Sequence, residues 1–150
     1  MAPHGRFQKT QRLVSPADFE RVYGFRMSAA SGPLVLYARP RVAGEAAAVG
    51  RTGQGLARLG VSVSRRIGNA VVRNRWKRRL REAFRAVQGR LPAGGDFVVV
   101  VRSGTPSAGA EAARDIEETI VSLAARVTGR PAYAAAAAAG PEPRRPEGKR

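Results

Sequence analysis

The sequence predicts an α+β fold in which amphipathic helices cover one small sheet, and three stretches of the chain indicate it. Residues 59–64 alternate apolar with small or polar side chains, as a strand with one buried face does. Residues 96–102 contain a phenylalanine followed by a run of valines, which is typical of a central strand buried on both sides. Residues 69–88 repeat apolar side chains at helical spacing. Packing these faces together gives a two-layer α/β sandwich in the order α-β-β-α-β-α.

The first helix and the first strand follow from local signals. Ser15 is suited to cap a helix and Pro16 to occupy its first position, so we expect a short helix over residues 16–23 that ends at Gly24. The apolar stretch 33–38 is bounded by glycine and proline and predicts a strand. These two elements precede the sheet strands named above, and the first helix needs an apolar partner on the sheet.

The long helix and the last helix also carry terminal signals. Asn69 is a plausible N-cap for the helix over 69–88, and Gly89 follows its last turn. Residues 110–127 predict a second amphipathic helix. Its apolar face is formed by Ile116, Ile120, Leu123 and Val127.

Composition divides the chain into one folded domain with flexible additions. Residues 1–12 are polar and basic without periodicity, and we expect them to be flexible. The domain spans 13–127 and is interrupted by a glycine-rich loop over 41–56, which we also expect to be flexible. Residues 128–150 are rich in alanine, proline and arginine and predict a disordered tail.

The charge and composition of the chain limit the classes of function that it can have. Twenty-seven Lys and Arg face eleven Asp and Glu, which gives a net charge of +16 and favours a polyanionic partner. The absence of cysteine excludes disulfides and thiol chemistry and is compatible with a cytoplasmic location. The single histidine, His4, lies in the flexible start, and the acids are scattered, so we expect no catalytic residues, no protein metal site and no membrane partner.

The basic charge is concentrated between Arg65 and Arg85, where nine Lys or Arg accompany one acid, Glu82. On a helix, the apolar residues of this stretch fall on one arc of about 120°, while arginines fall opposite. One face therefore packs on a core, with Trp76 and Phe84 in it, and the other presents guanidinium groups to phosphates. The phosphate contacts expected from charge alone are Arg65, Arg66, Arg73, Arg75, Lys77, Arg78, Arg79, Arg81 and Arg85.

Three aromatic residues are candidates for stacking on unpaired bases. Phe19 and Tyr23 lie one turn apart on the first helix, and Tyr37 lies on the first strand, so together they line a groove that fits a single strand. Packing in the core is the alternative. It is favoured for Phe19, whereas the two tyrosines fit both interpretations, because their hydroxyls need water or a partner.

The stretch from Gly60 to Phe84 resembles the signature of the bacterial ribonuclease P protein subunit. Its centre, Arg73-Asn74-Arg75, matches the RNR motif of that family. Residues 18–23, 34–37 and 95–102 resemble the family's first helix, first strand and the strand after the long helix. The resemblance covers roughly residues 10–127, and it implies a fold like the second domain of ribosomal protein S5.

The resemblance also implies a function. The protein is expected to bind the catalytic ribonuclease P RNA, one protein to one RNA, and the 5′ leader of precursor tRNA. It would thereby promote endonucleolytic removal of the leader, while RNA-bound Mg²⁺ performs the hydrolysis. The leader cleft would contain Phe19, Tyr23 and Tyr37. The implied contacts to the catalytic RNA are Arg65, Arg66, Asn69, Arg73, Asn74, Arg75, Lys77, Arg78, Arg81 and Arg85.

The alternative interpretation is a protein that binds ribosomal RNA, or assists ribosome assembly, without a role in tRNA processing. The two interpretations share the basic helix and differ in whether precursor tRNA cleavage is stimulated.

Overall fold

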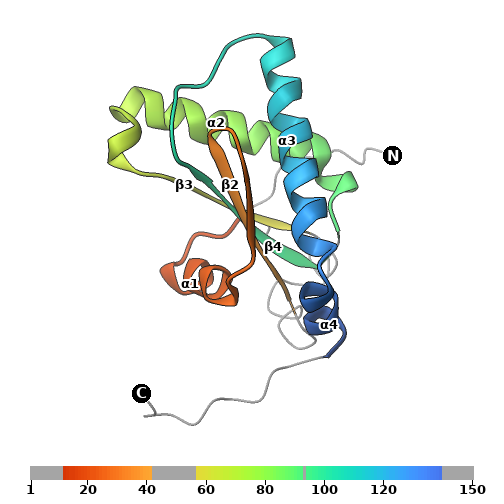
Figure 1. Cartoon of the computed structure of the whole chain (residues 1–150). Helices are drawn as coiled ribbons and strands as arrows, with labels where there is room; N and C mark the ends of the chain where they lie inside the picture. Colours follow the sequence, from red (N-terminus) through yellow and green to blue (C-terminus); the bar gives the residue numbers. More distant parts are fainter. Residues whose placement is uncertain (1–11, 42–56, 93, 140–150) are drawn as a thin grey trace.

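A four-stranded mixed sheet organises the protein. The computed structural model describes residues 12–41, 57–92 and 94–139, and Figure 1 traces the whole chain. The sheet has the strand order β1-β2-β4-β3. In chain order the elements are α1 (Pro16–Phe25), β1 (Ser28–Ser31), β2 (Leu34–Pro40), β3 (Arg58–Val63), η4 (Arg65–Ile67), α2 (Ala70–Val87), η5 (Gln88–Arg90), β4 (Gly95–Val101), α3 (Ala110–Thr128) and α4 (Pro131–Ala139).

The strand β4 lies in the centre of the sheet, as its run of valines predicts. It pairs antiparallel with β2 and parallel with β3, and β2 also forms an antiparallel hairpin with β1. Six of the seven β4 residues are buried. The parallel pair β3–β4 is connected through α2, so the basic helix is held at both ends by the sheet.

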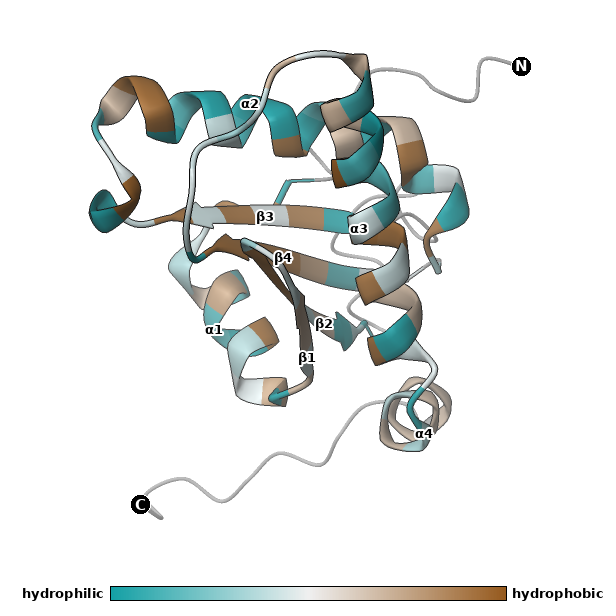
Figure 2. Cartoon of the chain, turned by 45° about the horizontal axis from the view of Figure 1, so that its top comes forward, coloured by the Kyte–Doolittle hydropathy of each residue, from teal (hydrophilic) through white to brown (hydrophobic). Residues whose placement is uncertain are grey.

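Helices cover both faces of the sheet (Figure 2). On one face, α2 and α3 pack on alternate strand residues, and this core includes Leu36, Phe97, Leu80, Phe84 and Ile120. On the opposite face, α1 packs on the other set of strand residues. The α+β class is confirmed, but α1 adds a third layer to the two that the sequence predicts. The reason is the alternation along β2 and β4, whose second face is also partly apolar.

The long helix has the predicted boundaries and the predicted apolar face. The Asn69 side chain accepts a hydrogen bond from the Val72 amide at 3.0 Å and caps α2. Trp76 is 2% exposed, and its indole Nε1 donates to the Gly104 carbonyl at 3.0 Å, which ties α2 to the segment after β4. The buried side of α2 consists of Trp76, Leu80, Ala83, Phe84 and Val87.

The first helix begins at the predicted residue and ends two residues later than predicted, at Phe25. The Ser15 side chain accepts from the Asp18 amide at 3.1 Å, with Pro16 in the first turn. The helix continues through Gly24 to Phe25, and Arg26 ends it in the left-handed conformation with φ 62°. Gly24 has no close neighbour that requires glycine there.

Four elements were not predicted from the sequence: the short 3-10 turns η4 and η5, the strand β1 and the helix α4. The strand β1 consists only of serine and alanine, so it lacks the β-branched pattern of a strand and depends on pairing with β2. The predicted disorder of residues 128–150 is wrong for α4, because alanine favours helix and Tyr133 anchors the segment at 5% exposure. The flexible segments expected at 1–12 and 41–56 lie outside the described residues, apart from Arg12 and Arg41.

Candidate nucleic-acid interface

One continuous basic surface runs from η4 along α2. All ten residues that the family resemblance assigns to the catalytic RNA lie on this stretch, and hydrophilic residues line much of α2 in Figure 2. Three of them, Arg73, Lys77 and Arg81, are partly buried. The exposed ones are Arg65, Arg66, Asn69, Asn74, Arg75, Arg78 and Arg85. The folded helix thus presents fixed guanidinium groups on the side away from the sheet.

Two of the predicted contact residues also hold the start of α2 together. The Asn69 side chain is engaged by its cap, and Arg73 Nε donates to the Gly68 carbonyl at 3.1 Å. Gly68 leaves room for this arrangement, because a Cβ there would lie 3.0 Å from the Val72 side chain. The side chains of Asn69 and Arg73 therefore fix the geometry from which their neighbours project.

The basic surface extends beyond the residues found in the sequence. Partial burial, and to a lesser extent the charge of Arg12, lower the pKa of Arg81. The ordinary pKa of arginine is so high that Arg81 stays charged at neutral pH. Arg12 forms a bridge with Leu59 of β3, which places the end of the N-terminal segment beside α2. The spacing of apolar residues in the sequence does not predict that Arg12 lies there.

A cavity of about 320 Å³ lies where β4 ends near the start of α2. Its lining includes Arg66 and Arg102, two arginines that are separated by the whole of α2 and β4 in the sequence. Arg102 Nε donates to the Gly32 carbonyl at 2.9 Å, which orients its guanidinium. Arg102 was not among the predicted contacts, because a single arginine at the end of a strand is an ordinary boundary residue.

The three predicted aromatic residues come together on the α1 face of the sheet, and we name Phe19, Tyr23 and Tyr37 the aromatic cluster. The ring centroids of Phe19 and Tyr23 are 6.3 Å apart, and those of Tyr23 and Tyr37 are 4.9 Å apart at 80°. All three side chains are partly buried around Val22 and Val98. The rings thus pack on the sheet and still expose part of their surface.

Local contacts fix the positions of these rings. The Phe19 ring lies over Gly60, where a Cβ would stand only 2.7 Å from Phe19 Cζ, so a residue without a side chain is needed in β3. Burial raises the pKa of Tyr23, although a side-chain hydrogen bond with Ser62 opposes the shift. Tyr23 therefore remains a neutral phenol at neutral pH and keeps its hydroxyl proton.

The described parts of the chain contain no cluster of protein metal ligands. Within residues 12–41, 57–92 and 94–139, no three His, Cys, Asp or Glu side chains gather as a group suited to hold a metal ion. None of the helices in these ranges combines the length and the apolar character that crossing a membrane requires. The arrangement is suited to binding a polyanion on one side and unpaired bases on the other.

The sequence model of the family described as Ribonuclease P matches residues 7–126, which include α1, the whole sheet and α2. The chain belongs to the ribonuclease P protein family. Ribonuclease P is a bacterial ribonucleoprotein endoribonuclease that processes tRNA, and the members of this family are its RNA-binding protein component. A ribonuclease P RNA is therefore the expected partner. The helix α4 lies beyond the matched region.

Individual ribonuclease P proteins confirm the assignment. The protein component from Brevibacillus brevis is 36% identical over 118 residues, which cover 79% of this chain and 83% of that relative. The solved RNase P protein of Staphylococcus aureus aligns with a TM-score of 0.57 and 28% identity, over 75% of this chain and 91% of the other. For the RNase P protein from Thermotoga maritima the TM-score is 0.51 at 28% identity, over 75% and 89%.

Proposed function

We propose that this chain binds the catalytic ribonuclease P RNA through the basic surface of η4 and α2. We also propose that it holds the single-stranded 5′ leader of precursor tRNA at the aromatic cluster and so promotes removal of the leader. The observation that carries the proposal is the separation of the two surfaces. Guanidinium groups line the outside of α2, whereas the aromatic cluster lies across the sheet beneath α1.

The binding steps follow from the two kinds of side chain. Exposed arginines such as Arg75 and Arg78 donate paired hydrogen bonds to phosphate oxygens, which secures the protein on the catalytic RNA. The rings of Tyr23 and Tyr37 offer faces and edges to unstacked bases, and this contact tolerates different leader sequences. One protein per RNA accounts for both contacts, since each surface occurs on a different side of the same domain.

We assign the hydrolysis to the RNA and its bound Mg²⁺, since the described carboxylates do not gather into a protein site for the ion. The protein contributes positive charge where two RNAs meet, and this charge reduces the repulsion between their phosphates. Less Mg²⁺ is then needed to bring catalytic RNA and substrate together. A cytoplasmic location, with the RNA partners, completes the proposal.

Cleavage of a precursor tRNA at limiting Mg²⁺, by a bacterial ribonuclease P RNA with and without this protein, tests the proposal. We expect strong stimulation with a long leader and little with a leader of a single nucleotide. Equal stimulation with the long and the short leader would contradict leader binding. Tight binding to the RNA without any stimulation would favour the ribosomal or assembly role instead.

A further inference from the structure

A cavity of about 180 Å³ lies between α2, α3, the turn of the β1–β2 hairpin and the segment that joins β4 to α3. Figure 1 shows this segment passing α2 on its way to the start of α3. The most deeply buried residues of the lining are Leu34 and Trp76, each 2% exposed. None of the lining residues belongs to the predicted RNA contacts or to the aromatic cluster. The proposed function therefore gives this cavity no role.

Hydrogen bonds hold the walls of the cavity in place. The Trp76 indole Nε1 donates to the Gly104 carbonyl at 3.0 Å, which fixes the beginning of the segment between β4 and α3. At the end of that segment, the Ala113 amide donates to the Gly109 carbonyl at 3.1 Å in the first turn of α3. Pro106, between these two contacts, is buried. The cavity is thus formed before a ligand arrives, as small-molecule sites usually are.

The inner part of the cavity is apolar and large enough for one aromatic ring. Leu34, Trp76 and Ile116 contribute to its lining from β2, α2 and α3. An apolar cavity of about 150 Å³ holds one benzene molecule, so a ligand with a single ring fits here. Burial of the ring against these side chains would supply the hydrophobic part of the binding free energy.

The rim of the cavity has one charged group, the exposed carboxylate of Asp115 on α3. Asp115 takes part in none of the ion pairs found in the described parts of the chain. Glu111 and Glu118 lie one helical turn away on either side of it, and their charges also favour a cation at this rim. Thr105 and Ser107 add hydroxyl groups that accept hydrogen bonds. An ammonium group suits this combination of acceptors.

We propose that this cavity binds a small aromatic amine, with the ring against Leu34, Trp76 and Ile116 and the ammonium group at Asp115. The inference is independent of the proposed function, because the two share no residue. A neutral aromatic compound would use the apolar walls and leave the carboxylate without a partner. An aliphatic polyamine would pair with the carboxylate and leave the space for a ring unfilled. The apolar interior and the single acid at its rim together favour the aromatic amine.

The only tryptophan of the chain makes binding to this cavity observable. The indole N–H of Trp76 gives one side-chain signal in a proton–nitrogen correlation spectrum of the full-length protein, and this signal should shift as phenethylamine is added. We expect the shift to saturate with a dissociation constant on the order of 1 mM, which is typical of so small a ligand. Phenethyl alcohol has nearly the same shape without the charge. It should bind about three- to fivefold more weakly, since an exposed ion pair contributes little.

Three variants make the result specific. Asp115→Asn should remove the preference for the amine over the alcohol, whereas the matched control Glu111→Gln changes an acid outside the lining and should keep it. Ala112→Leu enlarges a side chain of the lining and should abolish the binding of both compounds, with an unchanged melting temperature as proof of folding.

Three outcomes would overturn the inference. The first is a Trp76 signal that does not saturate with phenethylamine, or that shifts equally in folded Ala112→Leu. The second is equal affinity of the wild-type protein for the amine and the alcohol. The third is a preference for the amine that survives Asp115→Asn.

Discussion

Arg73 and Arg75 are two positions apart on α2 and contribute differently. Arg73 is partly buried and its Nε donates to the Gly68 carbonyl, so it helps to close the first turn of the helix. Arg75 is exposed, as is Arg78 one turn further on. Arg73 and Arg75 belong to the same motif, and only the structure shows the difference between them. Arg73 stabilises the start of the helix, whereas Arg75 is exposed to solvent.

Replacing Arg75 and Arg78 together by alanine should weaken binding to ribonuclease P RNA without unfolding the protein. At about 1 kcal/mol for each lost phosphate contact, the affinity falls by about 30-fold. The slope of log affinity against log salt should also become shallower by about two. Filter binding over a range of KCl concentrations measures both quantities. The matched control is Arg114→Ala with Arg126→Ala, which removes two exposed arginines from α3; an equal loss there would contradict a localised interface.

Replacing Tyr37 by leucine should impair the handling of the leader alone. Leucine keeps an apolar contact for Tyr23 but removes the ring, and one base–aromatic stack contributes about 1–3 kcal/mol. We therefore expect KM for a long-leader substrate to rise by about tenfold, with KM for a leaderless substrate unchanged. Steady-state cleavage assays on the two substrates provide the comparison. Equal increases on both would show that the aromatic cluster serves only the core.

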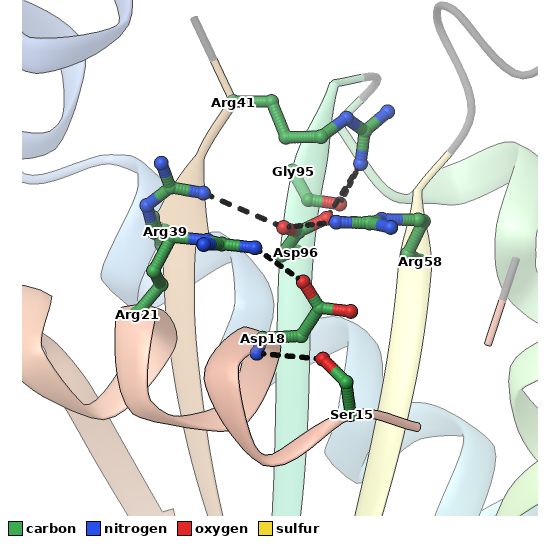
Figure 3. A network of polar contacts seen from close by, with 8 residues as sticks. All are labelled: Ser15, Asp18, Arg21, Arg39, Arg41, Arg58, Gly95 and Asp96. Carbon is green, nitrogen blue, oxygen red and sulfur yellow. Dashed lines mark hydrogen bonds and ion pairs between the residues drawn. The ribbon is translucent and has the colours of Figure 1, made fainter. Parts of the chain in front are cut away.

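At the scale of elements, the sequence predicts what depends on local signals and misses what depends on distant partners. The cap of α2, its apolar face and the central position of β4 were all predicted, because Asn69 and the valine run mark them. The hairpin strand β1 was not, since it owes its conformation to β2. The three aromatic residues were predicted to lie together, whereas Arg39 and Arg58 meet at Asp96 only through the register of three strands (Figure 3).

The helix α4 shows how one residue fixes a segment. Tyr133 packs edge-on against Phe25 at the end of α1, with ring centroids 6.0 Å apart, and its hydroxyl lies close to Gly95. The rest of the helix is almost entirely alanine. Helix propensity alone does not hold so short a helix in water, so Tyr133 is what attaches it to the domain.

Tyr133→Ala should lower the free energy of unfolding by about 3 kcal/mol, as removal of a buried ring does. Tyr133→Phe should cost far less and serves as the control. Burial raises the pKa of the Tyr133 phenol, and the nearby charge of Asp96 adds to the shift. Above the ordinary tyrosine pKa of about 10 the unfolded chain therefore loses this proton first, and stability declines as pH rises.

The phenylalanine variant should show a weaker decline above that pH. Denaturant unfolding at a series of pH values, for the wild type and Tyr133→Phe, measures the difference. Parallel curves for the two proteins would mean that Tyr133 is not buried against the sheet as described.

Across the whole molecule, charge is distributed unevenly. Nine Lys and Arg lie between residues 65 and 85, whereas the neighbouring helix α3 carries four acids: Glu111, Asp115, Glu117 and Glu118. Of these, Glu118 pairs with Arg90 at 3.0 Å on the surface. If RNA binds α2 as proposed, the acids of α3 would repel it from the outer side of α3 and would help to orient the protein on its partner.

Because the net charge of the chain is +16, added salt should stabilise the folded protein but weaken its binding to RNA. Raising KCl from about 0.05 to about 0.3 M shortens the range of repulsion between the protein's own charges, so the melting temperature of the free protein should rise. Over the same range, its affinity for ribonuclease P RNA should fall steeply. Thermal unfolding and RNA titrations in matched buffers test these two expectations. A melting temperature that falls with salt would mean that ion pairs outweigh self-repulsion.

The strand order has a consequence for synthesis on the ribosome. The strand β4 is the last to be made, yet it occupies the place between β2 and β3. Until it emerges, the β1–β2 hairpin and the β3–α2 segment have no shared partner, and both leave strand edges unpaired. The arginine-rich helix is therefore complete before the sheet that orients it. A nascent chain stopped just before Gly95 contains every residue of η4 and α2, but it lacks the central strand of the sheet.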